Sequence, residues 1–219
     1  MSSRPCPTCG ASVAFRSAAP YTVCSYCQSL LVRRDASLES IGRVAEVPDD
    51  FSPLQLNVTG LFEGRRFTLV GRIRKAWEQG SWSEWCAMFD DIRLGWLAEA
   101  QGDLVMTFER PLDSLSPTAA AERLRVTTAG ESYRIDGRHF TIADVKSVTC
   151  VGAEGELISC PAPGTAMQSI DLHGPGLEFA TLELSGETIC VFSGRYVDFA
   201  ECRFTGLRAL DGWSPVARR

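Results

Sequence analysis

Alternating apolar and polar residues between Gly60 and Glu109 predict a series of short β-strands. Phe67, Leu69 and Ile73 alternate with polar residues, as in a strand that buries one face. Three further runs follow after glycine or acidic turns, namely Trp85 to Phe89, Ile92 to Trp96 and Leu104 to Phe108. Four strands joined by tight turns predict an antiparallel meander that curls into a small barrel or sandwich.

A short repeat suggests that the second half of the chain copies the first. The sequence GRRFTL at Gly64–Leu69 returns as GRHFTI at Gly137–Ile142, seventy-three residues later, and each copy follows an acidic residue. Each copy also begins a series of short strands. The repeat therefore predicts either two similar β units or one larger barrel built from duplicated halves. Between them, the stretch SPTAAAERL at residues 116–124 predicts one short helix.

Four cysteines near the start of the chain have the spacing of a metal-binding ribbon. Two C-x₂-C pairs, separated by fourteen residues, can place four thiolates on one ion, and Gly10 allows the left-handed backbone of the first knuckle. We expect one structural Zn²⁺ per chain and, because all four ligands are sulfur, no open catalytic position. Two disulfides or free thiols are the alternative reading. The expected ligands are Cys6, Cys9, Cys24 and Cys27.

The predicted fold is mostly β, with a zinc ribbon followed by duplicated antiparallel small-barrel or sandwich units and one or two short helices. Asp35 is predicted to cap a short helix in the linker, with Leu38 and Ile41 on its apolar stripe. The expected segments are the zinc ribbon (1–34), the linker with its short helix (35–54), the first β unit (55–115), the connecting helix (116–129), the second β unit (130–210) and a tail (211–219).

The first half also carries a family resemblance. Its motif positions are Gly64, Phe67 and Gly71 in one strand, Trp82, Glu84 and Trp85 in the next, and Trp96 and Leu97 in the third. This pattern resembles a bacterial domain-of-unknown-function family, DUF4178, over roughly residues 55 to 208. The family has no established activity, so the resemblance implies fold and lineage. Similar proteins are often encoded near membrane-stress, filament-forming and polyamine-related systems, which implies an accessory role.

Composition and charge narrow the functional classes. The chain has 219 residues and a net charge of −5, but its first 34 residues hold four arginines and no acidic residue. A small basic head on an acidic body is not typical of a protein that coats nucleic acid, so nucleic-acid binding is unlikely. No run of 18 apolar residues and no apolar signal segment are found. We expect a cytoplasmic protein, of unknown oligomeric state, that reaches a membrane only through a partner.

The leading functional hypothesis is a non-catalytic adaptor that binds another protein. Aromatic rings and arginines favour interfaces, and tryptophans of this kind also fill the core of small barrels. The candidate partner-binding residues are Arg72, Arg74, Trp77, Trp82 and Trp85.

Two alternatives remain open. An enzyme of unknown reaction would use Asp171 and His173, from a turn rich in glycine and proline, together with Cys160, if the three side chains converge. Familiar hydrolase, nucleotide-binding and dehydrogenase motifs are not found in the sequence. Nucleic-acid binding through the ribbon would rest on its four arginines and its aromatic rings.

Overall fold

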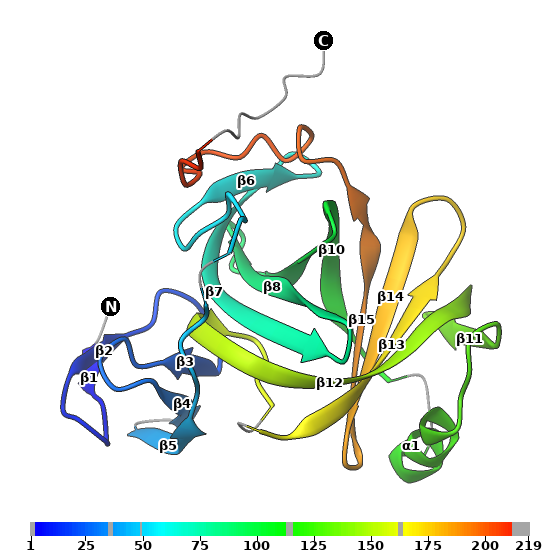
Figure 1. Ribbon diagram of the computed structural model, residues 1–219, viewed down its shortest axis with the longest axis horizontal. Helices are drawn as coiled ribbons and strands as arrows, with labels where there is room; N and C mark the ends of the chain where they lie inside the picture. Colours follow the sequence, from blue (N-terminus) through cyan, green and yellow to red (C-terminus); the bar gives the residue numbers. More distant parts are fainter. Residues whose placement is uncertain (1–2, 35–36, 49, 113–115, 162–163, 212–219) are drawn as a thin grey trace.

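The computed structural model describes residues 3–34, 37–48, 50–112, 116–161 and 164–211 (Figure 1). The N-terminal head contains β1 (Ser3–Pro5), β2 (Ser12–Ala14), β3 (Tyr21–Val23), β4 (Ser29–Arg34) and β5 (Ser37–Arg43). The first half of the body contains β6 (Thr59–Phe62), β7 (Arg65–Trp77), β8 (Gly80–Phe89), β9 (Leu94–Ala100) and β10 (Asp103–Arg110). After helix α1 (Pro117–Arg125), the second half contains β11 (Ser132–Ile135), β12 (Arg138–Leu157), β13 (Ala166–His173), β14 (Glu178–Ser185) and β15 (Thr188–Val197).

Eight strands of the body close into a single barrel. Strands β7 to β10 pair with one another in chain order, and so do β12 to β15. Two antiparallel seams join these half-sheets, because β10 pairs with β15 and β7 pairs with β12. Of the two arrangements that the repeat left open, the molecule has the one larger barrel. The mostly β, antiparallel fold is confirmed.

The internal repeat is visible in the strand register. Thr59 pairs with Thr68 in the hairpin that starts the first half, and Ser132 pairs with Thr141 in the hairpin that starts the second. Both hairpins have a two-residue turn, Glu63-Gly64 in the first and Asp136-Gly137 in the second. All four of these residues have positive φ, as a type I′ turn requires. At the seam between β7 and β12, Ala76 pairs with Thr149. Thr149 is also the residue equivalent to Ala76 in the second copy of the repeat, seventy-three residues later. The halves are therefore related by an approximate two-fold axis through this seam.

Glycines allow the half-sheets to approach closely at both seams. A Cβ added to Gly71 in β7 would lie 1.9 Å from the carbonyl oxygen of Glu156 in β12. In the other seam, a Cβ on Gly194 of β15 would lie 1.8 Å from the carbonyl oxygen of Met106 in β10. Only a residue without a side chain fits such spacing.

Two hydrophobic clusters cover the outside of the barrel. A bulge between Leu69 and Gly71 sets which residues of β7 face outward. On this face Trp85 and Phe89 pack beneath β6 and the segments that flank the barrel in sequence. The other cluster lies beneath α1, which Figure 1 shows outside the ring. The Ser116 side chain accepts a hydrogen bond from the N–H of Ala119, so the predicted connecting helix is confirmed.

The head is attached to the barrel by backbone pairing and by a shared core. β3 pairs with the far end of β12, where Thr22 is opposite Glu156. Val23 and Leu30 of the head pack in one cluster with Ile73 and Cys86 of the barrel. The Glu156 carboxylate accepts hydrogen bonds from the backbone N–H groups of Arg16 and Ser17. Head and barrel are therefore continuous structure.

The predicted linker helix is wrong. Residues Ser37–Arg43 form β5, which pairs with β4, and Asp35 lies outside the described residues. The spacing of Leu38 and Ile41 is compatible with either element, but the apolar strand β4 needs a partner for its open edge. The tail after Asp211 also lies outside the described residues. Among the described residues, no helix has the length and apolar character needed to cross a membrane.

Candidate functional site

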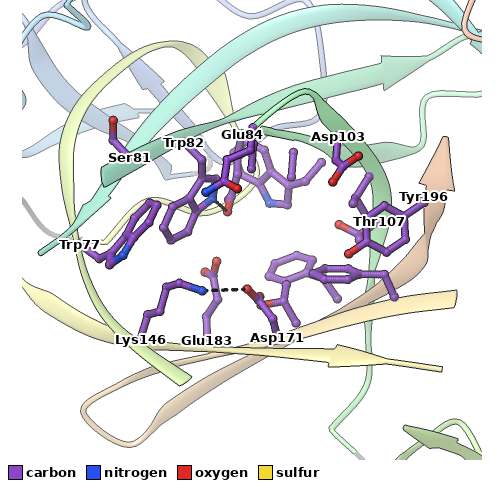
Figure 2. Close-up of a pocket in the computed structure, with 18 residues that line it drawn as sticks. Trp77, Ser81, Trp82, Glu84, Asp103, Thr107, Lys146, Asp171, Glu183 and Tyr196 are labelled. Atoms are coloured by element: carbon purple, nitrogen blue, oxygen red, sulfur yellow. Dashed lines mark hydrogen bonds and ion pairs between the residues drawn. The ribbon is translucent and has the colours of Figure 1, made fainter. Parts of the chain in front are cut away.

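The barrel contains an interior cavity of about 220 Å³ (Figure 2). All eight strands of the closed ring contribute side chains to its lining, so the cavity lies inside the ring. Along β14, Phe179, Thr181 and Glu183 face the cavity, while the alternate residues Ala180 and Leu182 belong to the outer cluster. The two faces of β14 thus divide between the cavity and the outer core.

One side of the cavity is aromatic. Trp77 ends β7 and Trp82 lies near the start of β8, so the β7–β8 hairpin brings both rings together with their centroids 5.5 Å apart. The Trp82 indole N–H donates a hydrogen bond of 2.8 Å to Glu84 Oε1, which fixes the ring. Trp96 and Tyr196 also line the cavity. The aromatic side can hold an apolar or a cationic group.

Three charged side chains form a buried cluster at the cavity wall. Lys75 is 1% exposed, and its Nζ donates hydrogen bonds to Glu84, at 2.7 Å, and to Glu183. Burial opposes the charge on Lys75, but the two carboxylates outweigh it and raise the lysine pKa. Burial raises the pKa of Glu183, and the neighbouring Glu84 carboxylate raises it further. The Lys75 ammonium therefore has to balance two carboxylates, those of Glu84 and Glu183.

A second pair of charged side chains lines the cavity, and Figure 2 shows Lys146 and Asp171 joined by an ion pair. Asp171 of β13 is 4.0 Å from Lys146 Nζ, while the same ammonium makes a closer ion pair with Asp144. Burial raises the pKa of Asp171, although Lys146 and a hydrogen bond with Thr181 oppose the shift. Lys146 Nζ also lies 5.7 Å from the centre of the Trp77 ring.

The proposed partner-binding residues do not form one surface. Trp77 and Trp82 line the cavity, whereas Trp85 is completely buried in the outer core. Arg72 is 4% exposed, stacks on Trp85 at 4.5 Å and pairs with Asp50. Arg74 lies on the same outward face, because the bulge after Leu69 inverts the alternation, and it also pairs with Asp50. Arg72 and Trp85 are therefore buried within the chain and present no exposed surface to a protein partner in this conformation.

The residues of the enzyme hypothesis do not converge. His173 is the last residue of β13, with its Nε2 3.2 Å from the Tyr196 hydroxyl, and not part of the following turn. Asp171 faces Lys146 and Thr181. Cys160 packs near Cys150 in the cluster shared with the head, where burial and the Cys150 thiol raise its pKa. Among the described residues, no hydrogen bond joins the three side chains.

The four cysteines of the head do come together. Their sulfur atoms all lie within 4.8 Å of one another, with 3.7 Å between Cys6 and Cys27 and 3.8 Å between Cys9 and Cys24. Four sulfurs placed about 2.3 Å from a tetrahedral zinc would be separated by about 3.8 Å. The residues can therefore hold a metal ion, and their arrangement fits a zinc ribbon.

Both metal knuckles have the same backbone geometry. The N–H of Gly10 donates to the Cys6 carbonyl, and the N–H of Gln28 donates to the Cys24 carbonyl, both at 2.9 Å. Gly10 and Gln28 both have positive φ, so the predicted left-handed position is confirmed in the first knuckle and is occupied by glutamine in the second. Hydrogen bonds from Ser29 lower the pKa of the Cys27 thiol, whereas the pKa of Cys9 in the same cluster is raised.

The basic residues of the head are engaged within the chain. Arg16 pairs with Glu156 and donates to Asn57, and Arg33 stacks on Phe15 at 3.8 Å. Arg34 pairs with Glu39. These contacts reduce the positive surface on which the nucleic-acid alternative depends.

Sequence reasoning singled out Trp77, Trp82 and Asp171 but did not connect them. It mentioned Lys75 only as a neighbour of the tryptophans in a possible groove, and it gave no role to Lys146 or Glu183. One signal was available, because Lys75 follows Ile73 at the two-residue spacing of a buried face and is one of only two lysines in the chain. Its partners lie on other strands, so the sequence alone could not identify the cluster.

The match to known proteins agrees with the observed architecture. A family model described as a domain of unknown function (DUF4178) matches residues 55–199, about two thirds of the chain. Comparisons with curated proteins and with solved structures gave no match. The matched range contains all eight strands of the closed ring, α1 and the two hairpins that start the halves. Because the family model covers more than half of the chain, this protein belongs to the DUF4178 family.

Proposed function

We propose that this protein is a non-catalytic binding protein whose barrel cavity holds a small organic ligand. The cavity of about 220 Å³ inside the closed ring carries the proposal. An eight-stranded barrel is just wide enough to enclose one small ligand. Aromatic faces and a few positioned polar groups are the usual lining of such a site.

The arrangement of charged groups favours binding over catalysis. Lys75 already neutralises part of the charge on Glu84 and Glu183, and the Trp82 indole fixes Glu84 in place. General acid–base catalysis needs groups that are free to exchange protons with a substrate. The side chains of this cluster instead hold one another in position, as in a preformed binding site.

Blocking the cavity tests this proposal. Ala98 lines the cavity, and Ala98→Phe places a ring inside it. Ala143, on the exposed side of β12, provides the control substitution Ala143→Phe. A library of small organic molecules is screened by thermal shift and by tryptophan fluorescence, since Trp77 and Trp82 report on the site. We expect binders that A143F retains and A98F loses. Binders that A98F retains, or a screen without binders, would reject the cavity as the functional site.

The adaptor hypothesis remains our second proposal, on a groove that adjoins the cavity and shares Ser81, Gln101, Asp103 and Tyr196 with its lining. This groove is lined by residues 50–53, the β9–β10 turn and residues 196–201. Phe51 is 94% exposed and Leu177 is 60% exposed at this groove. Such side chains favour a protein partner.

Exposed residues outside the groove offer a matched control for the adaptor proposal. We expect a double Phe51→Ser and Leu177→Ser variant to lose partners that the unaltered protein captures from its native cell. Ile92 is 78% exposed on a turn away from the groove, so Ile92→Ser should retain the same partners. Equal capture by all three proteins would remove the groove from consideration.

We further propose that the four cysteines hold one structural Zn²⁺. Sulfur ligands in a tetrahedral arrangement favour zinc, and a head with so few residues is stabilised by a metal. The nine cysteines are all unpaired, which agrees with a reducing compartment such as the cytoplasm. Elemental analysis of purified protein should give about one zinc per chain. Iron in place of zinc, or no metal after reductive purification, would contradict the assignment.

A further inference from the structure

We propose that the ligand of the barrel cavity is a small organic cation, with a primary ammonium group that lies against Asp171 and the aromatic side of the site. This inference rests on the proposed binding function of the cavity and deepens it by naming the chemical class. Three observations carry it: the balance of charges around the cavity, the position of Lys146, and the pairing of aromatic rings with carboxylates.

The cavity has more acidic than basic groups. Glu84, Glu183 and Asp171 line it, and the nearest basic groups are Lys75 and Lys146. Lys75 is shared between two glutamates, and Lys146 makes its closer ion pair with Asp144, which does not line the cavity. Asp103 adds a further carboxylate to the lining. The cavity lining therefore carries more negative than positive charge, and a cationic ligand can balance it.

The carboxylates also disfavour one another. Burial is the main cause of the raised pKa of Asp171, and the charges of Glu84 and Asp144 add to it. Burial also raises the pKa of Glu183, and although Lys75 opposes this shift, the Glu84 and Asp171 carboxylates add to it. An added ammonium inside the cavity would relieve this repulsion, whereas a bound anion would increase it.

Lys146 shows how an ammonium group fits the cavity. Its Nζ lies 4.0 Å from an Asp171 oxygen and 5.7 Å from the centre of the Trp77 ring. An ammonium over an indole face beside a carboxylate is a favourable arrangement for a cation. The lysine makes its closer ion pair with Asp144, which is exposed and does not line the cavity. A ligand ammonium can occupy the same position from within the cavity and displace the Lys146 side chain.

The volume limits the size of the ligand. A cavity of 150 Å³ accepts benzene, so about 220 Å³ corresponds to roughly nine non-hydrogen atoms. A short alkylammonium fits within this limit and can place its chain against the aromatic side. We therefore use n-pentylammonium as the cationic probe, with 1-pentanol and pentanoate as neutral and anionic probes of nearly equal shape.

The first experiment compares the three probes on the full-length protein. Affinity is measured by calorimetry and by the fluorescence of the cavity tryptophans. We expect n-pentylammonium to bind at least about tenfold more tightly than 1-pentanol, the effect of one charge-assisted hydrogen bond, and pentanoate to bind least. Equal or tighter binding of the alcohol or the carboxylate overturns the assignment to cations. It leaves the cavity intact as a binding site. The absence of n-pentylammonium binding also overturns the assignment, and the library screen with A98F and A143F decides separately whether the cavity binds a ligand.

Two isosteric substitutions locate the charge that matters. Asp171→Asn removes the carboxylate inside the cavity, and Asp144→Asn removes an equal charge from outside the lining. We expect D171N to weaken n-pentylammonium binding about tenfold and D144N to change it by less than about threefold. Equal losses in the two variants would show a general effect of net charge and overturn the assignment of Asp171.

A third variant tests competition by the internal ammonium. Lys146→Met keeps most of the side-chain volume but removes the charge that occupies the proposed position. We expect n-pentylammonium to bind K146M at least about threefold more tightly than the unaltered protein, because Lys146 no longer repels the ligand. Weaker binding by K146M would place the ligand elsewhere and overturn the model.

Discussion

Lys75 connects the two halves of the barrel through a single side chain. It extends from β7 of the first half, reaches Glu84 on the neighbouring strand β8, and contacts Glu183 on β14 of the second half. The whole cluster is buried, so none of its charges is well screened by water. Removing one member of such a cluster leaves the others unpaired.

We predict that Lys75→Met lowers the free energy of unfolding by about 3–5 kcal/mol at neutral pH. The loss reflects two carboxylates left buried without their counter-ion. Lys146→Met is the matched control, because it removes the only other lysine but from a partly exposed pair, and it should cost about 1 kcal/mol or less. Chemical denaturation measures both. A K75M protein as stable as K146M would mean that the cluster contributes no net stability.

The pH dependence of K75M follows from the direction of the Glu183 shift. The folded-state pKa of Glu183 is raised, mainly by burial. A raised carboxyl pKa gives stability that is complete below the unfolded pKa and is lost as pH rises through the folded pKa. Without Lys75 this pKa rises further. The difference in stability between K75M and the unaltered protein should therefore narrow from about pH 8 to about pH 5, as denaturation at each pH can show.

The seam glycines give a second prediction for single residues. Gly71→Ala places a Cβ 1.9 Å from a backbone oxygen, so the half-sheets must move apart. Gly186 has φ +59° and open space around it, so Gly186→Ala costs only the strain of the left-handed backbone, about 1–2 kcal/mol. We expect G71A to lose clearly more stability than G186A in thermal unfolding. Equal losses would show that the seam can relax.

At the scale of elements, the head and the barrel should respond differently to removal of the metal. The head strands depend on the cysteine cluster, whereas the barrel is closed by its own pairing. Chelation should therefore abolish amide protection in β1 to β4, together with the end of β12 that pairs with β3, while β8, β9 and β14 stay protected. Hydrogen exchange resolves these segments. Loss of protection throughout the barrel would show that the metal controls the whole fold.

Element types were predictable where the determinants are local. Alternation predicted β8 and β10, and the capping pattern predicted α1, because both signals depend on neighbouring residues. Ile92 was predicted in a strand but occupies a turn with φ 65°, since Phe89 and Arg93 close a tight turn around it. The linker was misread as a helix because the open edge of β4, which β5 covers, is a tertiary feature.

The two candidate sites differ in how far they could be predicted, because one depends on local residues and the other on the tertiary structure. The metal ligands are predictable from their spacing, because each C-x₂-C pair forms a single local turn. The two turns then have to meet only each other for the four cysteines to form one cluster. The cavity is lined from eight strands spread over the body, and its charges meet only once the ring closes. A bulge in β7 also reverses the alternation after Leu69, so Leu69 and Ile73 lie on opposite faces of the strand although simple alternation placed them on one.

For the whole molecule, ring closure implies that neither half is complete alone. Separating the chain into fragments 1–114 and 115–219 leaves β7 and β10 of the first half, and β12 and β15 of the second, without their seam partners. We predict that each fragment alone lacks a cooperative unfolding transition and that co-expression restores a one-to-one complex with one. Circular dichroism and size exclusion measure both properties. A fragment that folds as a stable monomer would contradict this prediction.

The two-fold relation at the β7–β12 seam also explains how the two halves can place different charged groups around the cavity. Two identical chains associating about such an axis would carry every interior group twice. Here the position equivalent to Lys75 in the second half is Val148, at the same seventy-three-residue offset that relates Ala76 to Thr149. Because one chain carries both halves, one copy can carry an amine while its counterpart carries an aliphatic side chain. The lopsided distribution of charge around the cavity is a property that only a chain holding both halves can encode.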